Sequence, residues 1–547
     1  MSSERLSSPP VDRALRIVVA VAVVVGVILR FLPRSGLWLD EALTVNISTL
    51  PLGDIPDALR RDGHPPLHYV LLNAWTSIGG TSDWWVRALS GVLSLGALPL
   101  AFIAGRRIAQ RAGAGPLGEH RTALIALALM AMLPYGVRYG SETRMYALVS
   151  LLALGGYLLA EDLLTARSAG RRRAAVAGGA ALVTAGLLWS HYWSMWLLAA
   201  IGLLALWVGF RSSDAARRTG GRLLAGAMVL GGVLYLPWVP TLLYQSERTG
   251  TPWGASVGPV EMLTITLTDL SGDSLTSYLA ALAVSVALLA LLVARRAGAE
   301  RGGDPVPFDD QHVVIGASIQ RRIPVEAGLF VATLGIGWAA STATSNTYVT
   351  RYAAVVYPLF VLCIAAGVAV VRERRATVAV LSLFLLMSVY VGVSNARTDR
   401  TQAGELAEFI GADLAAAGID GTEAAGAASI VACPDQIGVA LQRALDGRRI
   451  NLEIIAFPLA EDPRFIDWVD YGERNEAADV SEFFERVDDR IPDDGTVYVA
   501  AMPGYRTYEG LCEGVISHLS GRRPLQEVVE RGDAGETMGL WVFGPPE

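Results

Sequence analysis

Long apolar runs recur along the first 395 residues of the chain, and short polar segments separate them. A hydrocarbon layer of about 30 Å needs about 20 apolar residues in helical form. Runs of this kind predict about eleven membrane helices, at 15–33, 86–105, 122–137, 145–162, 174–190, 194–210, 223–243, 276–294, 326–342, 352–371 and 376–394. The first run lacks a small-residue cleavage site, so we expect a retained anchor rather than a cleaved signal peptide.

The pattern changes after residue 395, where helical segments alternate with short apolar runs of strand length. Segments 401–417 and 480–490 are predicted helices. The predicted strands are 429–433, 452–457, 496–502 and 538–543. This alternation predicts a small α/β domain with a mostly parallel sheet. The predicted fold is therefore mainly α, with a polytopic membrane module at 1–395 and a soluble α/β domain at 396–547.

Arginine sets the expected orientation, because the chain contains no lysine. The arginine-rich segments alternate with arginine-poor ones and lie at 13–16, 106–121, 167–173, 211–222, 295–322 and 372–375. Cytoplasmic loops are enriched in arginine and lysine. The sequence therefore predicts a multi-pass protein of the cell (plasma) membrane. Its N-terminus is expected in the cytoplasm and, because the number of spans is odd, its C-terminal domain outside.

Composition agrees with this division. Hydrophobic residues make up 52% of the chain and charged residues 18%, against about 25% charged in soluble proteins. The tail is acidic and the chain has no basic patch, so nucleic acid is not an expected partner.

The chain has three cysteines. Cys433 and Cys512 both lie in the tail, and Cys363 lies in an apolar run. Their spacing fits no zinc site. The two tail cysteines can form a disulfide if the tail is extracytoplasmic, and the sequence does not decide between the bonded and the free form.

Two adjacent carboxylates, Asp40 and Glu41, follow the first predicted span directly. Ionisable groups at the membrane boundary are costly if buried, so they tend to be functional. The alternative is structural, with Asp40 capping a short helix over 42–47. The same outer loop contains His64 and His68 around two prolines. Two histidines four residues apart can ligate a divalent metal such as zinc, or His68 can simply hydrogen-bond to neighbouring helices.

A third polar cluster interrupts the apolar region at 138–144, where we expect an outer loop. It contains Arg138, Tyr139, Glu142 and Arg144. Arginine suits bidentate contact with phosphate. The alternative is an internal ion pair between arginine and Glu142 that fixes the turn, and both interpretations can hold together.

Two smaller clusters fall on the same predicted side of the membrane. His191 and Tyr192 lie in a turn rich in tryptophan, which is also typical of an interfacial aromatic belt. Arg351 and Tyr352 begin another apolar run, where the arginine can hold a phosphate or extend to lipid headgroups. The uncommon polar clusters thus all face outward in this prediction, as expected for one shared site.

Four of these motifs occur in a fixed order: Leu-Asp-Glu-Ala at 39–42, Gly-His-Pro-Pro-Leu at 63–67, Arg-Tyr-Gly-Ser-Glu-Thr-Arg-Met-Tyr-Ala at 138–147 and Arg-Tyr at 351–352. The set resembles the C-type membrane glycosyltransferases, in particular the glycosyltransferase family 39-like group. That group includes protein O-mannosyltransferases and the bacterial lipid A aminoarabinose transferase. The resemblance covers about residues 10–395, and the lysine-free, Ala- and Arg-rich composition is typical of a high-GC bacterium.

The resemblance implies that a sugar is transferred from a polyprenyl-phosphate carrier to a cell-envelope glycan, lipid or protein, with inversion in a single displacement. Mannose is the expected sugar, and a pentose such as arabinose is the alternative. Asp40 would be the general base, with Glu41 beside it. The residues expected to bind the donor and its lipid phosphate are His64, Arg138, Glu142, Arg144, Arg351 and Tyr352. Those expected to line the acceptor cavity are His68, Tyr139, His191 and Tyr192. His64 takes the place of a lysine found in some relatives, which leaves phosphate contact and metal ligation both open for it.

Two other classes of function fit the sequence less well. A transporter or lipid flippase would usually show an inverted repeat with paired broken helices, and the sequence shows no such repeat. A non-catalytic membrane-anchored binding protein would act through the tail, but the retention of Asp40, Glu41, Arg138 and Glu142 together argues against it.

Overall fold

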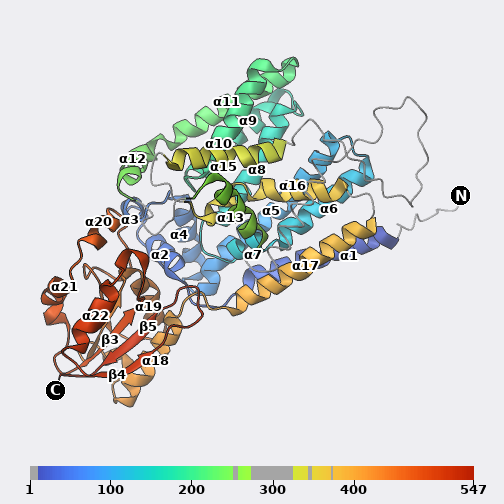
Figure 1. The fold of residues 1–547 in the computed structure, drawn as a ribbon. Coiled ribbons are helices and arrows are strands. Elements are labelled where there is room, and N and C mark those ends of the chain that lie inside the picture. The colour runs from blue at the N-terminus through green and yellow to red at the C-terminus, as the bar shows by residue number, and fades with distance from the viewer. Residues whose placement is uncertain (1–9, 250–256, 273–324, 343–347, 371–373, 547) are drawn as a thin grey trace.

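The structure is a computed structural model that describes residues 10–249, 257–272, 325–342, 348–370 and 374–546. A bundle of long helices forms the first part of the chain, and a domain built on a β-sheet lies at one end of this bundle (Figure 1). Three short helices of the first loop lie where the two parts meet: α2 (Leu39–Ser48), α3 (Ile55–Asp62) and α4 (Leu67–Gly79).

The bundle follows the apolar runs closely. Its helices are α1 (Pro10–Phe31), α5 (Asp83–Arg111), α6 (Pro116–Met132), α7 (Pro134–Gly140), α8 (Tyr146–Leu164), α9 (Gly170–Leu188), α10 (Ser194–Arg211), α11 (Ala215–Tyr235), α12 (Val239–Arg248), α13 (Pro259–Ser271), α15 (Val325–Thr342), α16 (Tyr357–Val370) and α17 (Arg374–Arg397). The predicted span at 276–294 lies outside the described residues. Every other predicted span is helical over most of its length.

Seven helices of the described chain are long and apolar enough to cross a membrane, and an eighth is counted if α6 and α7 form one bent span. The predicted number of about eleven is higher because the span at 276–294 lies outside the described residues and for two physical reasons. α16 has only 14 residues, because the apolar run before it begins as a 3-10 turn at Thr350–Val355. α9 begins with three consecutive arginines, so it carries too many charges to count as an apolar membrane-spanning helix.

The break between α6 and α7 explains one buried arginine in the first helix. The sequence predicted one helix over 122–137, but α6 ends before Pro134 and the chain bends by 52°. Proline has no N–H to donate to Met130, and Leu133 is extended, which also frees the Ala131 carbonyl. The Arg30 guanidinium donates to both carbonyls, at 3.0 and 2.6 Å. Gly26 permits this close approach, since a Cβ there would lie 2.1 Å from the Ala131 oxygen.

Replacing Arg30 with methionine is expected to lower the thermal stability of the protein. Two buried carbonyls would lose their donors, at about 1–3 kcal/mol each. The loss should be smaller in a Pro134→Ala background, because alanine supplies an N–H for the Met130 carbonyl. Thermal unfolding in detergent of the single and double variants measures this coupling, with exposed Arg34→Met as the control. Equal losses in both backgrounds would contradict the role assigned to Arg30.

The C-terminal domain has five strands in the order β2-β1-β3-β5-β4. They are β1 (Ala428–Cys433), β2 (Glu453–Ala456), β3 (Thr496–Ala501), β4 (Leu525–Val529) and β5 (Gly539–Phe543), and the helices packed with them are α18 (Ala403–Ala416), α19 (Asp435–Gly447), α20 (Tyr471–Glu476), α21 (Val480–Val487) and α22 (Leu511–Ser520). The four predicted strands are confirmed. The sheet is mixed rather than mostly parallel, because β5 and β4 run antiparallel to their neighbours. β4 was missed because its residues are mostly exposed and partly polar, as an edge strand permits.

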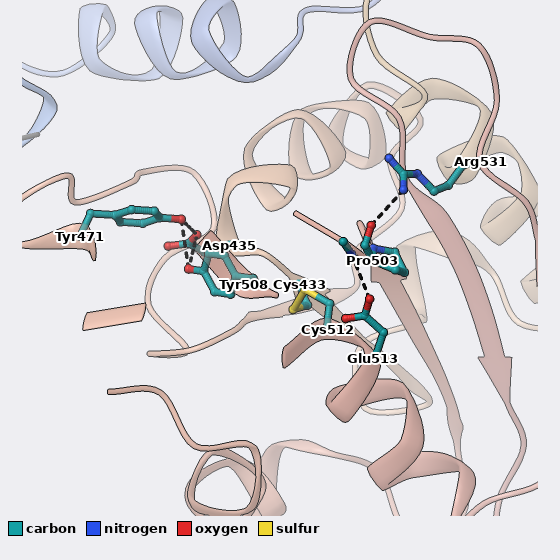
Figure 2. The surroundings of a disulfide bond; sticks show 9 residues. Cys433, Asp435, Tyr471, Pro503, Tyr508, Cys512, Glu513 and Arg531 are labelled. Atoms are coloured by element: carbon teal, nitrogen blue, oxygen red, sulfur yellow. Dashed lines mark hydrogen bonds between the residues drawn. A yellow bond between two sulfur atoms is a disulfide. The ribbon is translucent and has the colours of Figure 1, made fainter. Parts of the chain in front are cut away.

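The two tail cysteines form a disulfide that joins the end of β1 to the start of α22 (Figure 2). Next to it, the Tyr471 and Tyr508 hydroxyls donate to the Asp435 carboxylate at 2.6 and 3.2 Å. Burial raises the pKa of Asp435 to about 6. These contacts fasten the loops that follow β1 and β3. Cys363 is a buried free cysteine in α16.

Charged side chains form ion pairs near both ends of α5, at two levels along the length of the bundle. Arg87, near the start of α5, pairs with Glu41, whereas Arg107, near its end, pairs with Glu161. The two arginines are separated along this helix by about 30 Å, at 1.5 Å per residue, which is the thickness of a hydrocarbon layer. Arg167 also pairs with Glu161, so two arginine-rich segments meet at this second level. Asp40 and Glu41 of the first loop lie at the level of Arg87.

Candidate active site

Asp40 lies in the first turn of α2, just beyond the first long helix. Its carboxylate is 3.1 Å from Arg351 and 3.8 Å from Arg144. The side chain keeps 15% of its surface exposed, so it is not sealed off from solvent. The alternative in which Asp40 caps a helix over 42–47 is wrong, because the helix already begins at Leu39 and Trp38 occupies the N-cap position.

Glu41 occupies a different environment from its neighbour, because its side chain is fully buried. It accepts hydrogen bonds from Arg87 at 2.8 and 2.5 Å, from Arg400 at 3.2 Å and from the backbone N–H of Thr143 at 3.0 Å. Burial alone would raise the pKa of Glu41, but the two guanidinium groups outweigh it and lower that pKa well below its usual range. Glu41 therefore remains charged and joins α2, α5 and the turn around residue 143.

His64 connects two charged residues. Its Nδ1 is 2.9 Å from the Asp62 carboxylate, and its Nε2 is 3.0 Å from Nη2 of Arg144. A carboxylate only accepts and a guanidinium only donates, so Nδ1 carries the proton and Nε2 accepts. Tyr69 donates to the same Asp62 oxygen at 2.8 Å, and Arg144 donates to Thr44 at 2.7 Å. This chain of contacts orients the buried Arg144 beside Asp40.

Glu142 lies in the turn after α7 and is buried. Nη1 of Arg400 is 3.9 Å from its carboxylate, and Nη2 of Arg400 donates to Ser141 at 2.9 Å. Burial raises the pKa of Glu142, and Glu41 and Asp40 raise it further, whereas Arg400 and Arg138 lower it. The ion pair of Glu142 is thus made with Arg400 of the segment after α17, and not within its own segment as the structural alternative expected.

Arg351 and Tyr352 lie in the 3-10 turn Thr350–Val355, which precedes α16. The Arg351 guanidinium of this turn is the one that contacts Asp40. The Tyr352 ring is 5.3 Å from the His191 ring, which in turn lies 5.9 Å from the ring of Tyr146. Burial lowers the pKa of His191 to about 3, helped by the nearby positive charges of Arg144 and Arg351. The structure therefore brings His191 to the same site as Asp40, as a neutral ring.

Arg138 and Tyr139 belong to α7 rather than to a loop, because the helix restarts at Pro134 and continues to Gly140. The Arg138 side chain is 46% exposed and lies 3.8 Å from Asp269 of α13. Among the three arginines predicted to bind the lipid phosphate, Arg138, Arg144 and Arg351, it is therefore the most exposed. The Tyr139 ring packs between Tyr135 and Tyr146, and the Tyr135 hydroxyl donates to the backbone oxygen of Arg351 at 3.0 Å. α7 and the Arg351 turn are therefore in direct contact.

Two residues expected to line an acceptor cavity, His68 and Tyr192, differ in their surroundings. His68 is fully buried in α4, and burial beside Arg144 lowers its pKa to about 3. The Tyr192 hydroxyl donates to Gln245 and accepts from Trp238, so it joins α12 to the bundle rather than facing Asp40.

Sequence reasoning missed three residues of this network: Asp62, Arg87 and Arg400. Arg87 was recognisable from the sequence, because it is an arginine inside a predicted apolar span, at the end that adjoins an arginine-poor loop. Asp62 lay beside a histidine that was already a candidate. Arg400 left no local signal, because 359 residues separate it from its partner Glu41.

The site does not fit a divalent cation. Arginines face the Asp40 carboxylate, and both ring nitrogens of His64 are engaged by Asp62 and Arg144. In the part of the chain that the structure describes, no group of three or more His, Cys, Asp or Glu side chains is arranged to hold a metal. The arrangement suits an anion next to a base instead.

The fold is similar to that of ArnT from Cupriavidus metallidurans in the apo state, with a TM-score of 0.54 and 12% identity over 97% of this chain and 98% of that one. ArnT bound to undecaprenyl phosphate matches with a TM-score of 0.45 and 14% identity, over 96% and 97% of the two chains. The oligosaccharyltransferase AglB from Archaeoglobus fulgidus, in complex with an inhibitory peptide and a dolichol-phosphate, matches with a TM-score of 0.43 and 12% identity, over 93% of this chain and 72% of AglB.

No protein-family model and no curated protein sequence matches the chain. At 12% identity, the likeness to apo ArnT shows a shared fold. The predicted fold class, a mainly α polytopic membrane protein with a C-terminal α/β domain, is confirmed. The likeness also extends past residue 395, beyond the region that the motifs covered.

Proposed function

We propose that this chain is a membrane glycosyltransferase that transfers a sugar from a polyprenyl-phosphate donor to a cell-envelope acceptor. The observation that carries the proposal is the contact of a partly exposed carboxylate, Asp40, with the Arg351 guanidinium at 3.1 Å. Sugar transfer from a lipid phosphate needs both kinds of group in one site: a base for the acceptor hydroxyl on one face of the sugar, and a cation for the phosphate that departs from the other face. The ordered motifs and the fold shared with ArnT, an aminoarabinose transferase, support the same conclusion.

In the proposed reaction, the acceptor hydroxyl oxygen attacks the anomeric carbon, and its proton passes to the Asp40 carboxylate. The bond between the anomeric carbon and the phosphate oxygen breaks, and its electron pair leaves with the polyprenyl phosphate. Attack from the face opposite the leaving group inverts the anomeric centre in one displacement. A phosphate is a good leaving group, so the mechanism requires no general acid.

Two arginines are suited to the leaving phosphate. Arg351 has five N–H donors, so one guanidinium can contact both Asp40 and a phosphate oxygen. Arg138 is the most exposed of the candidate arginines, and its helix packs against the Arg351 turn. Arg144 is buried among His64, Thr44 and the Asp40 backbone, so we assign it to holding Asp40 rather than to phosphate.

The remaining predicted residues take supporting roles in this proposal. Glu41 joins α2 to the turn at Thr143, Glu142 shares the Arg400 guanidinium with Glu41, and His64 orients Arg144. Tyr139, His191 and Tyr352 form an aromatic wall beside the arginines. Mannose is the proposed sugar because the motif resemblance includes protein O-mannosyltransferases, and a pentose is the alternative.

We further propose that the site and the C-terminal domain face the outside of the cell membrane, with residues 1–395 as the transferase module and 396–547 as the outer domain. The first loop and this domain lie on the same side of the bundle, since Asn46 donates to the backbone of Arg464 and Arg443 contacts Asp83. A disulfide within the domain is typical of an oxidising, extracytoplasmic compartment. Nucleotide sugars are cytoplasmic, which accounts for a donor carried by a lipid.

The proposal predicts that the purified protein, reconstituted in lipid vesicles, consumes at least one radiolabelled polyprenyl-phosphate sugar from a panel of mannose, arabinose and other pentose or hexose donors. Free polyprenyl phosphate should appear at the same rate. The product's anomeric configuration, read by NMR, should be the inverse of the donor's. If no donor of the panel is consumed in the presence of extracted cell-envelope acceptors, the proposed function is wrong.

A further inference from the structure

The segment that enters the C-terminal domain pairs with a distant loop of that domain. Residues 399–402 lie between α17 and α18, and residues 535–536 precede β5. Gly535 N–H donates to the Asp399 oxygen at 3.1 Å, Glu536 N–H to the Arg400 oxygen at 2.9 Å, and Gln402 N–H to the Glu536 oxygen at 3.0 Å. We call this pair of segments the linker ladder. The Gln402 side chain, buried beneath it, accepts from the N–H groups of residues 532 and 538. The linker ladder is thus a rigid part of the C-terminal domain.

Two side chains of the linker ladder leave the domain and reach the segments around Asp40. Arg400 ion-pairs with Glu41, donates to Ser141 and lies near Glu142. Glu536 is 92% buried, by its 8% relative exposure, and one of its carboxylate oxygens accepts from the Leu39 N–H at 3.2 Å. That N–H belongs to the first turn of α2, where helical N–H groups have no partner in their own helix.

The two contacts hold the residues on both sides of the base. Leu39 and Glu41 flank Asp40 in sequence, and both are fastened to the linker ladder. Ser141 and Glu142 belong to the turn whose next residue, Thr143, donates to Glu41. The position of the Asp40 carboxylate relative to Arg351 is therefore set in part by a domain whose Arg400 lies 359 residues after Glu41 in the chain.

We infer that Arg400 and Glu536 are positioning residues for Asp40, and that the C-terminal domain is a working part of the active site rather than a separate binding module. The inference rests on the proposed function. It assigns to neither residue any contact with the sugar or the phosphate. A base displaced by about 1 Å can lose about 10²-fold in rate without losing its pKa or its substrate.

The chain offers a matched control in Arg443 of α19. This arginine also crosses from the C-terminal domain to the membrane module, where it contacts the Asp83 carboxylate at 2.7 Å and the backbone oxygen of Thr81. Its partners lie at the start of α5 and not in the segments that flank Asp40. Arg443→Ala thus removes a similar interdomain ion pair while the linker ladder remains.

The experiment compares Arg400→Ala, Arg400→Lys and Arg443→Ala in the full-length protein in lipid vesicles. We expect Arg400→Ala to lower kcat by about 10²-fold with the donor KM changed less than about threefold, because the base is displaced while the donor contacts remain. Arg400→Lys should recover part of this loss. Arg443→Ala should stay within about twofold of the wild type in kcat. Equal kcat values for the two alanine variants, or a loss confined to KM, would overturn the inference.

Hydrogen exchange supplies a readout that is independent of turnover. In Arg400→Ala, amide exchange should increase in peptides covering 39–48 and 141–145, and in Arg443→Ala it should not. Unchanged exchange in both segments would also overturn the inference, and Arg400→Lys serves for this comparison if Arg400→Ala does not fold. Failure of the proposed function is distinguishable, because the wild-type protein itself would then consume no donor while the exchange pattern still tests the linker ladder.

Discussion

Replacing Asp40 with asparagine is expected to reduce sugar transfer by about 10³-fold, within the range typical of a lost general base. The amide keeps the size of the side chain and cannot take the proton of the acceptor hydroxyl. The fold should persist, because the carboxylate is partly exposed and its ion pairs with Arg351 and Arg144 are not the only contacts of α2. Initial rates with saturating donor and acceptor measure the change, and the thermal midpoint in detergent checks the fold.

Asp57→Asn is the matched control, since this aspartate is exposed on α3 in the same outer loop. It should leave turnover within about twofold of the wild type, as expected for an exposed surface side chain. A second check is donor binding, which should persist in Asp40→Asn because the arginines assigned to phosphate are intact. Full turnover by Asp40→Asn would refute the assignment of the base, whereas loss of both binding and fold would point to a structural role.

Glu41→Ala is expected to destabilise the protein by about 3–5 kcal/mol, the loss typical of a buried ion pair from which one partner is removed. Arg87 and Arg400 would remain buried without their carboxylate, and the Thr143 N–H would lose its acceptor. Chemical or thermal unfolding in detergent measures the change. Glu41→Gln should lose less, because the amide oxygen can still accept from one guanidinium.

The comparison for Glu41 is an exposed pair of the same kind. Glu482 lies 3.5 Å from Arg486 on the surface of α21, and Glu482→Ala should cost no more than about 0.5 kcal/mol. If Glu41→Ala and Glu482→Ala changed the stability by similar amounts, Glu41 would not be the buried anchor described above. Retained stability together with lost turnover in Glu41→Ala would instead make Glu41 a direct participant in the reaction.

The helices of the bundle and most strands of the tail could be predicted from the sequence because their signal is local. A run of about 20 apolar residues has few ways to satisfy its backbone in lipid other than a helix, and four buried runs of the tail gave four strands. Errors occurred where a local signal was weak or was overridden. β4 is an exposed edge strand, and Pro134 divided an apolar run that continues past it.

The candidate residues of the site were also recognisable, because charged groups beside apolar spans are uncommon. Their roles were not. Asp40 and Glu41 are neighbours in one helical turn, yet one carboxylate is partly exposed and the other is fully enclosed by two arginines. Helical periodicity places adjacent side chains about 100° apart around the axis. It does not state which of them faces the interior.

The sequence by itself therefore determined a membrane protein with an α/β tail and an ordered set of polar residues in segments that are predicted to face outward. Only the tertiary structure decided that Glu41 is an anchor, that Tyr192 faces away from Asp40 and that Arg400 holds the turn next to the base. The physical reason is distance along the chain. Segment lengths and local motifs act within a few residues, whereas the partners of a buried charge are chosen by packing between segments that lie hundreds of residues apart.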